Sequence, residues 1–243
     1  MKYAYIVCSD NYCYQAEMVL RTLNKHCDCT VLLNVYNPPD DFNENVSKWF
    51  KKDYIIKDIS KEEWENKKMF CKIKLLLKMG FSYGDNVFVL DTDLFIQDDI
   101  FKIFEQGSDV YYTTRGHAQA TPAPINAGLW AFNFSERTER FLNFYIDQMY
   151  EPTWVPYIKF EESMMPLNRK TFAGRLDWWC DQDFLNAVYL NNNRVPFECK
   201  IVDIGPKYNF THAAINLVGD KNYKVLHFKG NRTKDFKKII ERI

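Results

Sequence analysis

The stretch Asn86-Val-Phe-Val-Leu-Asp91-Thr-Asp93 is the most informative part of this sequence. Four consecutive apolar residues, 87–90, predict a buried β-strand that runs directly into two acidic residues. Open α/β sheets bind ligands at the carboxyl ends of their strands, which is where these acids would lie. An extended backbone points Asp91 and Asp93 to the same face, and such oxygen ligands suit Mg²⁺ or Mn²⁺ that bridges phosphate groups. The alternative is a solvated turn that binds nothing.

The flanking segments predict an α/β domain. Apolar runs at residues 3–8 and 30–35 predict two strands, and the helix expected between them carries its apolar side chains on one face. A strand–helix–strand unit of this spacing requires a right-handed crossover and therefore a parallel sheet. Because the chain contains no repeat and no linker, we expect one domain over residues 1–243, with a mostly parallel central sheet flanked by helices. Further strands are expected at residues 54–56, 109–113, 129–132, 200–203 and 224–227, and helical stretches at 42–50, 60–80, 135–150 and 182–190.

The composition argues against several classes of function. The 243 residues contain 32 Lys and Arg against 32 Asp and Glu, so the net charge of zero argues against a nucleic-acid partner or a polybasic membrane surface. Seven scattered cysteines, an odd number, indicate reduced thiols in an intracellular compartment. The apolar run at residues 3–8 is too short for a signal-peptide core, and no run reaches the ~18 apolar residues of a transmembrane segment. We therefore expect a soluble, cytoplasmic protein, and nothing in the sequence indicates its oligomeric state.

His227 is a further candidate ligand at a strand end. It closes the run at residues 224–227 and precedes Gly230, which permits close approach of the backbone, and the cations Lys229, Arg232 and Lys234. An imidazole beside two carboxylates suits Mn²⁺ better than Mg²⁺, and the neighbouring cations can hold phosphate oxygens. The alternative is a histidine that only contacts a backbone carbonyl.

These motifs, taken with others in their order along the chain, resemble glycosyltransferase family 8, the glycogenin-like retaining sugar transferases with a GT-A fold. The matching blocks are Cys8-Ser-Asp-Asn-Tyr12 with Gln15-Ala16, similar to T-N-x-x-Y; Asp91-Thr-Asp93, similar to D-x-D; Pro124-Ile-Asn126-Ala-Gly128, similar to N-[SA]-G; Asp181-Gln-Asp-Phe-Leu-Asn186, similar to D-Q-x-x-L-N; and His227-Phe-x-Gly230, similar to H-F-x-G.

The resemblance implies a single Rossmann-like GT-A domain, with a nucleotide-binding half at residues 1–115 and a sugar and acceptor half at 116–243. It also implies a UDP-sugar donor and a Mn²⁺ ion, with Mg²⁺ as the alternative, that joins the diphosphate to Asp91, Asp93 and His227. The reaction would move a hexose or pentose to a hydroxyl group of a glycan, a protein or a small molecule, with retention of configuration.

The resemblance further implies a role for individual residues. Tyr12 would stack on the uracil, and Asp181 would lie nearest the transferred sugar, with Gln182 as an amide alternative for the catalytic role. Lys72 would bind phosphate, with Lys74 as the alternative. The remaining donor contacts implied are Cys8 and Ser9 at the base and ribose, Thr92 within the D-x-D segment, Asn126, Ala127 and Gly128 at the sugar, and Gly230, Arg232 and Lys234 at the diphosphate.

Two departures from the family pattern leave choices open. The family continues H-F-x-G-x-x-K-P-W, whereas residues 231–236 read Asn-Arg-Thr-Lys-Asp-Phe, so either Arg232 or Lys234 would hold the phosphates. Trp178 and Trp179 are either core residues or a face for an acceptor sugar.

Two other classes of function also remain open. A metal-dependent nucleotidyltransferase would also use strand-end acids, but it usually carries a Gly-rich loop, which the first β–α turn lacks. A non-catalytic module that binds a sugar nucleotide or a glycan would keep the aromatic residues but lose the metal ligands, and this chain keeps all three candidates.

Overall fold

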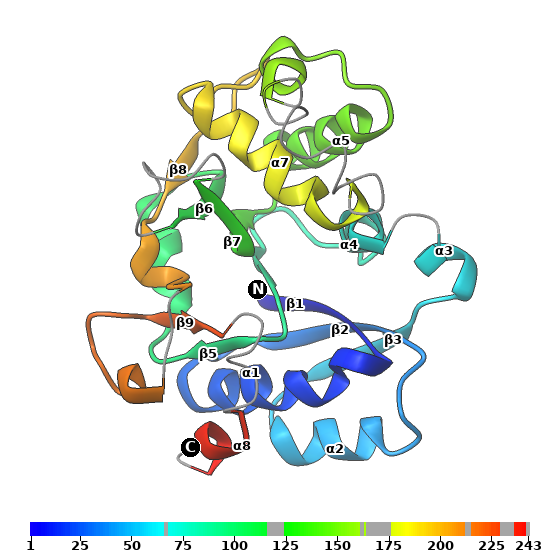
Figure 1. The fold of residues 1–243 in the computed structure, drawn as a ribbon, viewed down its shortest axis with the longest axis vertical. Coiled ribbons are helices and arrows are strands. Elements are labelled where there is room, and N and C mark those ends of the chain that lie inside the picture. Colours follow the sequence, from blue (N-terminus) through cyan, green and yellow to red (C-terminus); the bar gives the residue numbers. More distant parts are fainter. Residues whose placement is uncertain are drawn as a thin grey trace.

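A seven-stranded sheet forms the centre of the computed structural model, which describes residues 1–65, 68–115, 124–160, 163, 176–211, 215–228 and 236–241. The order across the sheet is β3-β2-β1-β4-β7-β6-β8 (Figure 1). Strand β7 is antiparallel to both of its neighbours, and all other pairs are parallel. The prediction of a single α/β domain with a mostly parallel sheet is therefore confirmed. The strands are β1 (Lys2–Ser9), β2 (Thr30–Tyr36), β3 (Tyr54–Asp58), β4 (Asn86–Leu90), β6 (Val110–Thr114), β7 (Ile125–Asn133) and β8 (Ile201–Asp203).

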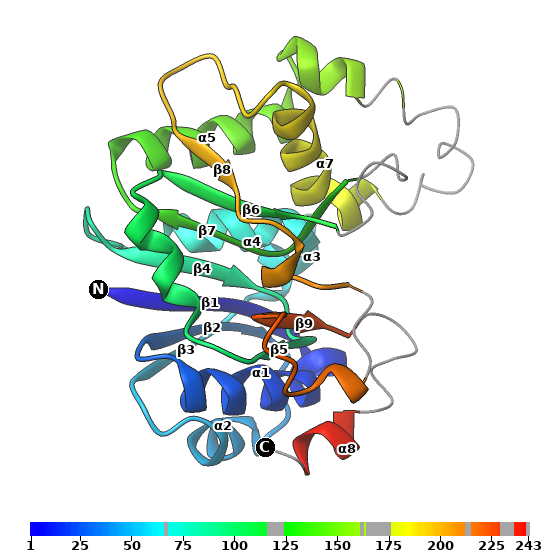
Figure 2. The same ribbon diagram turned by 90° about the vertical axis from the view of Figure 1, so that its left-hand side faces the viewer.

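Helices cover both faces of this sheet (Figure 2). On one face lie α1 (Cys13–His26) and α2 (Phe42–Trp49), and on the other lie α4 (Lys68–Leu77), α5 (Glu136–Tyr150) and α7 (Leu176–Leu190). Side chains alternate between the two faces along each strand. In β1, for example, Ala4 and Ile6 pack in the hydrophobic cluster on the α1 side, while Tyr5 packs in the cluster on the α5 and α7 side. The two apolar faces explain why the strands are such continuous hydrophobic runs.

The helical stretch predicted at residues 60–80 is described as α3 (Lys61–Glu65) followed by α4. Ser60 and Glu63 form the expected capping box, because Glu63 N donates to Ser60 Oγ and Ser60 N donates to Glu63 Oε2, both at 3.2 Å. The cap fixes where the helical segment begins after β3, and α4 then carries Lys72 back toward the sheet.

The most important differences from the predicted elements lie at β7, α7 and β9. Strand β7 begins at Ile125 instead of residue 129, so the Asn-Ala-Gly block lies inside the central sheet. The described part of α7 already includes Leu176, six residues before the predicted start at 182, because the residues directly before Asp181 contain no helix breaker and continue the helix. The run at 224–227 forms β9 (Val225–His227), which leaves the central sheet and pairs antiparallel with β5 (Leu94–Ile96) in a separate two-stranded sheet.

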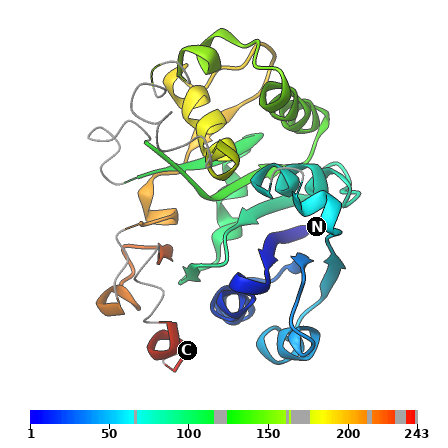
Figure 3. The same ribbon diagram turned by 45° about the vertical axis from the view of Figure 1, so that its right-hand side comes forward.

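The end of the described chain packs back onto the first helix (Figure 3). Helix α8 (Phe236–Ile240) contributes Phe236 and Ile239 to a hydrophobic cluster that also contains Met18 of α1. Short 3-10 helices complete the description, namely η1 (Asp10–Tyr12), η2 (Ile100–Gln106), η4 (Pro206–Tyr208) and η5 (Ile215–Leu217). None of the helices in the described ranges combines the length and the apolar character that a membrane crossing requires.

Candidate functional site

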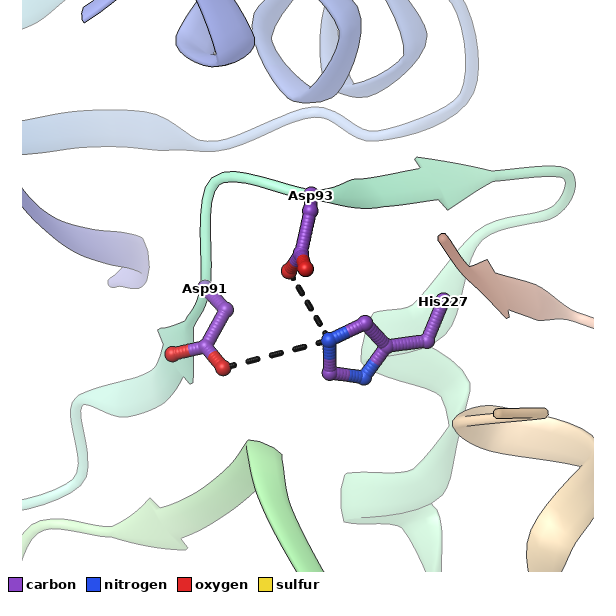
Figure 4. A group of neighbouring side chains, drawn as sticks. All are labelled: Asp91, Asp93 and His227. Carbon is purple, nitrogen blue, oxygen red and sulfur yellow. Dashed lines mark ion pairs between the residues drawn. The ribbon is translucent and has the colours of Figure 1, made fainter. Parts of the chain in front are cut away.

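Asp91, Asp93 and His227 converge at the carboxyl edge of the central sheet (Figure 4). Their ligand atoms all lie within 4.8 Å of one another. His227 Nε2 is 2.8 Å from Asp93 Oδ1 and 4.0 Å from Asp91 Oδ2. Two carboxylates and one imidazole nitrogen therefore face a common point, which is a donor set suited to a divalent cation.

The backbone around β4, β5 and β9 produces this convergence. The chain leaves β4 at Leu90, turns through the two acids, and enters β5, which pairs Leu94 opposite His227. The turn is held at both ends, since Asp91 N donates to Gly128 O at 2.8 Å and Phe228 N donates to Asp93 O at 2.9 Å. The acids follow the strand as predicted, whereas His227 reaches the site because β9 pairs with β5 in the separate two-stranded sheet.

Gly128 in β7 leaves the space that the site needs. A Cβ atom at this position would lie 2.7 Å from His227 Nδ1, closer still to Cε1 of the same ring, and 2.9 Å from Asp91 Oδ2. Real Cβ atoms essentially never come that close to other heavy atoms. Only glycine lets the imidazole and the carboxylate approach each other here, so this residue of the Asn-Ala-Gly block lies against the predicted metal ligands.

Buried amides surround the other nitrogen of the imidazole ring. Asn126 Nδ2 is 2.9 Å from His227 Nδ1, and Asn209 Oδ1 is 2.7 Å from the same atom. All three residues have no exposed surface. Asn209 was not among the residues predicted from sequence, although a polar residue between Tyr208 and Phe210 is a signal that could have indicated a buried polar group.

Lys72 of α4 is a buried cation on the carboxylate side of the site. Its Nζ lies 3.0 Å from Asp91 Oδ1, and its side chain is 4% exposed. Burial alone would lower the pKa of Lys72, but the charges of Asp91 and Asp181 outweigh it and raise that pKa above its usual value. The amine is therefore charged at neutral pH. The alternative residue, Lys74, is exposed and lies over the ring of Tyr150, 4.5 Å from its centroid.

Asp181 and Gln182 lie near the start of α7, and both are buried. Gln182 N donates to Asp181 Oδ1 at 2.9 Å. Gln182 Nε2 has no hydrogen-bond partner among the described residues, which leaves a buried donor available to a ligand. Further along the helix, Asn186 Oδ1 accepts from Ile125 N at 2.8 Å, so the last residue of the D-Q-x-x-L-N block joins α7 to the start of β7.

The predicted nucleotide contacts lie along the end of β1 and in η1. Ser9 is buried, and the side chain of Tyr12 is 40% exposed. Cys8 points into the hydrophobic cluster beneath the sheet, and its Sγ is 4.0 Å from Cys13 Sγ. The hydrogen bond with Cys13 and burial raise the pKa of the Cys8 thiol well above its ordinary value, so this residue is a neutral core thiol and any ligand contact would come from its backbone.

Thr92, between the two acids, is tied to the first helix. Its Oγ1 donates to Gln15 Oε1 at 3.1 Å, which connects the turn to α1. Ala127 is 5% exposed and lies in β7 between Asn126 and Gly128. The predicted phosphate contacts Gly230, Arg232 and Lys234 lie outside the described residues, as do the side chains of Trp178 and Trp179.

Comparison with known proteins gives structural matches only. No family model and no curated protein matches the sequence. The structure of galactosyltransferase LgtC in complex with donor and acceptor sugar analogs is similar, with 12% sequence identity, a TM-score of 0.61 and coverage of 100% of this chain and 96% of that chain. Mouse xyloside xylosyltransferase 1 in its apo form has 13% identity, a TM-score of 0.58 and coverage of 95% and 98%.

A third similar structure is the glycosyltransferase GlyE of Streptococcus pneumoniae, with 14% identity and a TM-score of 0.57. This chain aligns over 95% of its own length but spans only 56% of the GlyE chain. At such low identity the matches establish a common fold. The α/β architecture predicted from sequence is therefore one that these glycosyltransferase structures share.

Proposed function

We propose that this protein is a metal-dependent glycosyltransferase that moves a hexose or a pentose from a UDP-sugar to a hydroxyl group, with retention of configuration. The observation that carries the proposal is the convergence of Asp91, Asp93 and His227 beside the buried cation Lys72. This cluster lies at the carboxyl edge of a sheet whose fold matches structures of sugar transferases. The acceptor would be a glycan, a protein or a small molecule with a free hydroxyl.

The residues present fit a divalent cation. Two carboxylates would carry charge opposite to the ion, and the imidazole would supply a nitrogen ligand, a combination that favours Mn²⁺ over Mg²⁺. The missing side chain at Gly128 is consistent with a site in which the ligands must come close together. When bound, the cation would stabilise the negative charge of the departing diphosphate. Asp91, Asp93 and His227 are the residues that would hold it.

Lys72 would also assist the departure of the diphosphate. It is buried and charged, and Asp91 holds its Nζ at 3.0 Å. A fixed cation in a site that excludes water stabilises developing negative charge without having to reorganise first. We propose the same role for Arg232 or Lys234, with Gly230 allowing the backbone to approach the diphosphate.

The nucleoside would lie at the end of β1. Tyr12 presents an exposed ring on which a uracil can stack, while the backbone of Cys8 and the buried Ser9 lie where base and ribose contacts would form. Thr92 would keep the metal-ligating turn close to this part of the site through its bond to Gln15. In this arrangement residues 1–115 form the nucleotide-binding half and residues 116–243 the half that binds sugar and acceptor.

The transferred sugar would lie between β7 and α7. Asn126 and Ala127 would contact it from the sheet, and Asp181 or Gln182 from the helix. Asp181 would stabilise the positive charge that develops on the sugar ring, and the buried amide of Gln182 has a donor available to a sugar hydroxyl. A second similar structure is that of an LgtC active-site mutant in which a glutamine is replaced by glutamate, so a glutamine lies in the active site of that protein.

The proposal is tested with a panel of UDP- and GDP-sugars. Mn²⁺-dependent hydrolysis of a UDP-sugar donor is expected in the wild-type protein. The Asp93→Asn variant is expected to lose Mn²⁺-dependent UDP binding while it remains folded, because one of the two carboxylate ligands becomes a neutral amide. Asp58→Asn is the matched control, since Asp58 is an exposed acid at the carboxyl end of β3. Unchanged Mn²⁺-dependent UDP affinity of Asp93→Asn in calorimetry would refute the proposed metal site.

The stereochemistry has a test of its own. NMR of the product formed from an α-linked donor is expected to show an α-linkage. A β-linked product would place this protein outside the retaining class.

A further inference from the structure

We infer that Arg115 binds an anionic group, a phosphate or a carboxylate, on the acceptor of the transferred sugar. The inference rests on the proposed function, because that proposal supplies the acceptor. Arg115 directly follows β6, and Asp91 directly follows β4. Strand β7 is antiparallel to both β6 and β4, so these two strands run in the same direction and end at the same edge of the sheet. Arg115 therefore lies at the edge that carries the candidate metal site.

Arg115 is a partly buried cation, and no acid in the described part of the chain lies within ion-pair distance of it. Burial lowers the pKa of Arg115 below its usual value, but a guanidinium still remains charged at neutral pH. A cation that loses water without gaining a counter-ion costs free energy, which a bound anion would offset. The other described arginines are paired or exposed: Arg21 pairs with Glu17, and Arg137, Arg140 and Arg194 are exposed.

Asp203, the acid at the end of the neighbouring strand β8, is bonded to other groups. Its Oδ1 accepts from Thr114 N at 3.1 Å and from Gly205 N at 2.8 Å. Its Oδ2 accepts from Thr114 Oγ1 at 2.8 Å. These bonds hold the carboxylate against the end of β6 and the turn after β8. Asp203 is therefore not the counter-ion of Arg115, although the two residues lie at the ends of neighbouring strands.

One nitrogen of the guanidinium holds the group in place. Arg115 Nε donates to Ile125 O at 3.2 Å, and the backbone N of Arg115 donates to Pro124 O at 2.7 Å. Nη1 and Nη2 have no acceptor among the described residues. Two terminal nitrogens in one plane match the two oxygens of a carboxylate, or two oxygens of a phosphate, better than any other ligand. The side chain is thus positioned for an anion before one binds.

The start of β7 connects Arg115 to the proposed sugar site. Ile125 O accepts from Arg115, and Ile125 N donates to Asn186 Oδ1 of α7 at 2.8 Å. Asn186 lies four residues after Gln182, so the two amides project from the same side of the helix. The next residue of β7, Asn126, contacts the ring of the histidine ligand. A sugar held between β7 and α7 would therefore have Arg115 beside it.

The order of strands indicates which anion Arg115 would meet. Along the edge, β1 is followed by β4, β7 and β6. The proposed nucleoside lies at β1, the diphosphate at the acids after β4, and the sugar at β7, so β6 lies beyond the sugar. Two strand spacings separate β6 from β4 by about 10 Å. Because Lys72 and the metal ligands already supply charge at the diphosphate, we assign Arg115 to the acceptor.

The test compares sugars that differ in one anionic group. The wild-type protein is saturated with UDP and Mn²⁺, so that the diphosphate site is filled, and is titrated in a calorimeter with glucose, glucose 6-phosphate and glucuronic acid. We expect at least one of the two anionic sugars to bind at least ~10-fold more tightly than glucose, the effect of about one hydrogen bond to a charged group. Equal affinity for all three sugars would overturn the inference.

Two variants of Arg115 separate its charge from its shape. Arg115→Gln removes the charge and should abolish the preference for the anionic sugar. Arg115→Lys keeps the charge but lacks the planar pair of terminal nitrogens, so it should retain only part of the preference. An undiminished preference in Arg115→Gln would overturn the inference. So would an equal loss of affinity for glucose and for the anionic sugar, because Arg115 would then only hold the start of β7 in place.

Arg194→Gln is the matched control, because Arg194 is an exposed arginine in the loop after α7, at the end of that helix far from Asp181. It should leave the preference for the anionic sugar unchanged.

The inference and the proposed function fail separately. UDP affinity is measured in every variant, and a fall in Arg115→Gln as large as the loss of anionic-sugar affinity would place Arg115 at the diphosphate and overturn the inference alone. A wild-type protein that binds neither UDP nor Mn²⁺ would refute the proposed function. Inorganic phosphate titrated into that protein and into Arg115→Gln would still test Arg115, since equal phosphate affinity of the two would overturn its role as an anion ligand.

Discussion

The two sides of the candidate metal site are built in different ways. Asp91 and Asp93 come from a single turn between β4 and β5, and their side chains are 31% and 19% exposed. His227 comes from β9 near the end of the chain, and its side chain is only 1% exposed. The carboxylate side is thus a continuous piece of sequence at the sheet edge, whereas the imidazole side depends on pairing between distant segments.

Because the two sides are built differently, substitutions on each side should disturb the metal site in different ways. Carboxylates that follow a buried strand keep their position as long as the strand forms, because the strand is held by packing on both faces of the sheet. The imidazole depends on the two-stranded sheet, on a glycine that leaves it space, and on buried amides that orient it. We therefore expect changes on the imidazole side to act on geometry, and changes on the carboxylate side to act on charge.

The largest effect is expected where both sides meet, at Gly128. In Gly128→Ala the new methyl group would collide with the ring of His227 and with Asp91, so one ligand must move away. We expect Mn²⁺ affinity to fall by more than about 100-fold, beyond the ~10–100-fold typical of losing an outer partner. Overpacking should also lower the free energy of unfolding by about 1–3 kcal/mol.

Gly107→Ala is the control that separates a loss of Mn²⁺ affinity from a general loss of stability. Gly107 has a positive φ of 63° and an open space around it, so alanine there costs stability without touching the site. Calorimetric titration of Mn²⁺ and thermal unfolding are measured for both variants. Equal Mn²⁺ affinity in the two would mean that the site does not depend on the space at Gly128.

A smaller effect is expected from the charge of Asp181 in α7, which lies outside both sides of the metal site. This carboxylate contributes to the raised pKa of Lys72, and it would face positive charge that exists mainly in the transition state. Asp181→Asn should therefore reduce turnover at least ~100-fold, about 2.7 kcal/mol of barrier, with donor affinity within a few-fold of wild type. Asp183→Asn, on the same helix, is the control. Parallel losses of turnover and donor affinity would make Asp181 a binding residue instead.

A variant of Tyr12 tests whether the nucleotide binds at the end of β1. Its exposed ring would stack on the base, so Tyr12→Ala should weaken UDP binding by ~1–2 kcal/mol, within the ~1–3 kcal/mol typical of stacking between a base and an aromatic side chain. Tyr83→Ala removes an exposed ring from the loop before β4 and should leave UDP affinity unchanged. Full UDP affinity in Tyr12→Ala would remove Tyr12 from the site.

The smallest effect concerns a surface ion pair that anchors the imidazole side. Lys224, directly before β9, pairs with Asp98, which lies two residues after β5, the strand with which β9 pairs. The amine of Lys224 lowers the pKa of Asp98 below its ordinary value of 3.8, and the N–H of Asp99 adds to this against the opposing effect of burial. A lowered pKa in the folded state means that the stabilisation is present above pH ~4 and is lost as the pH falls through the folded pKa.

Asp98→Asn should therefore be less stable than wild type at pH 7 by at most about 1 kcal/mol, the usual limit for a pair this exposed. The difference should be the same at pH 5 and should shrink below pH 4, where the wild-type carboxylate becomes protonated. Urea unfolding at the three pH values measures it. A difference that persists at pH 3 would show that Asp98 acts through something other than its charge.

Local sequence patterns account for much of the architecture. The apolar runs correctly predicted the buried strands β1, β2 and β4. The two acids were also correctly predicted to follow the end of a strand. The prediction of a helix at 182–190 left out the part of α7 from Leu176 to Asp181, because no helix breaker before 182 separates these residues from the rest of the helix. The strand at β9 was predicted, but its partner β5 was not, since pairing between distant strands leaves no local pattern.

The sequence by itself determined which chemical groups are available: two acids behind a buried strand, a histidine at a later strand end, and lysines on a helix after β3. Only the tertiary structure decided which of them meet. It brings Lys72, and not Lys74, to Asp91, because only one of these two positions on α4 faces the sheet. It also places the unpredicted Asn209 against His227 and leaves the space at Gly128. Burial and periodicity act within a segment, whereas these contacts depend on how segments far apart in the chain pack together.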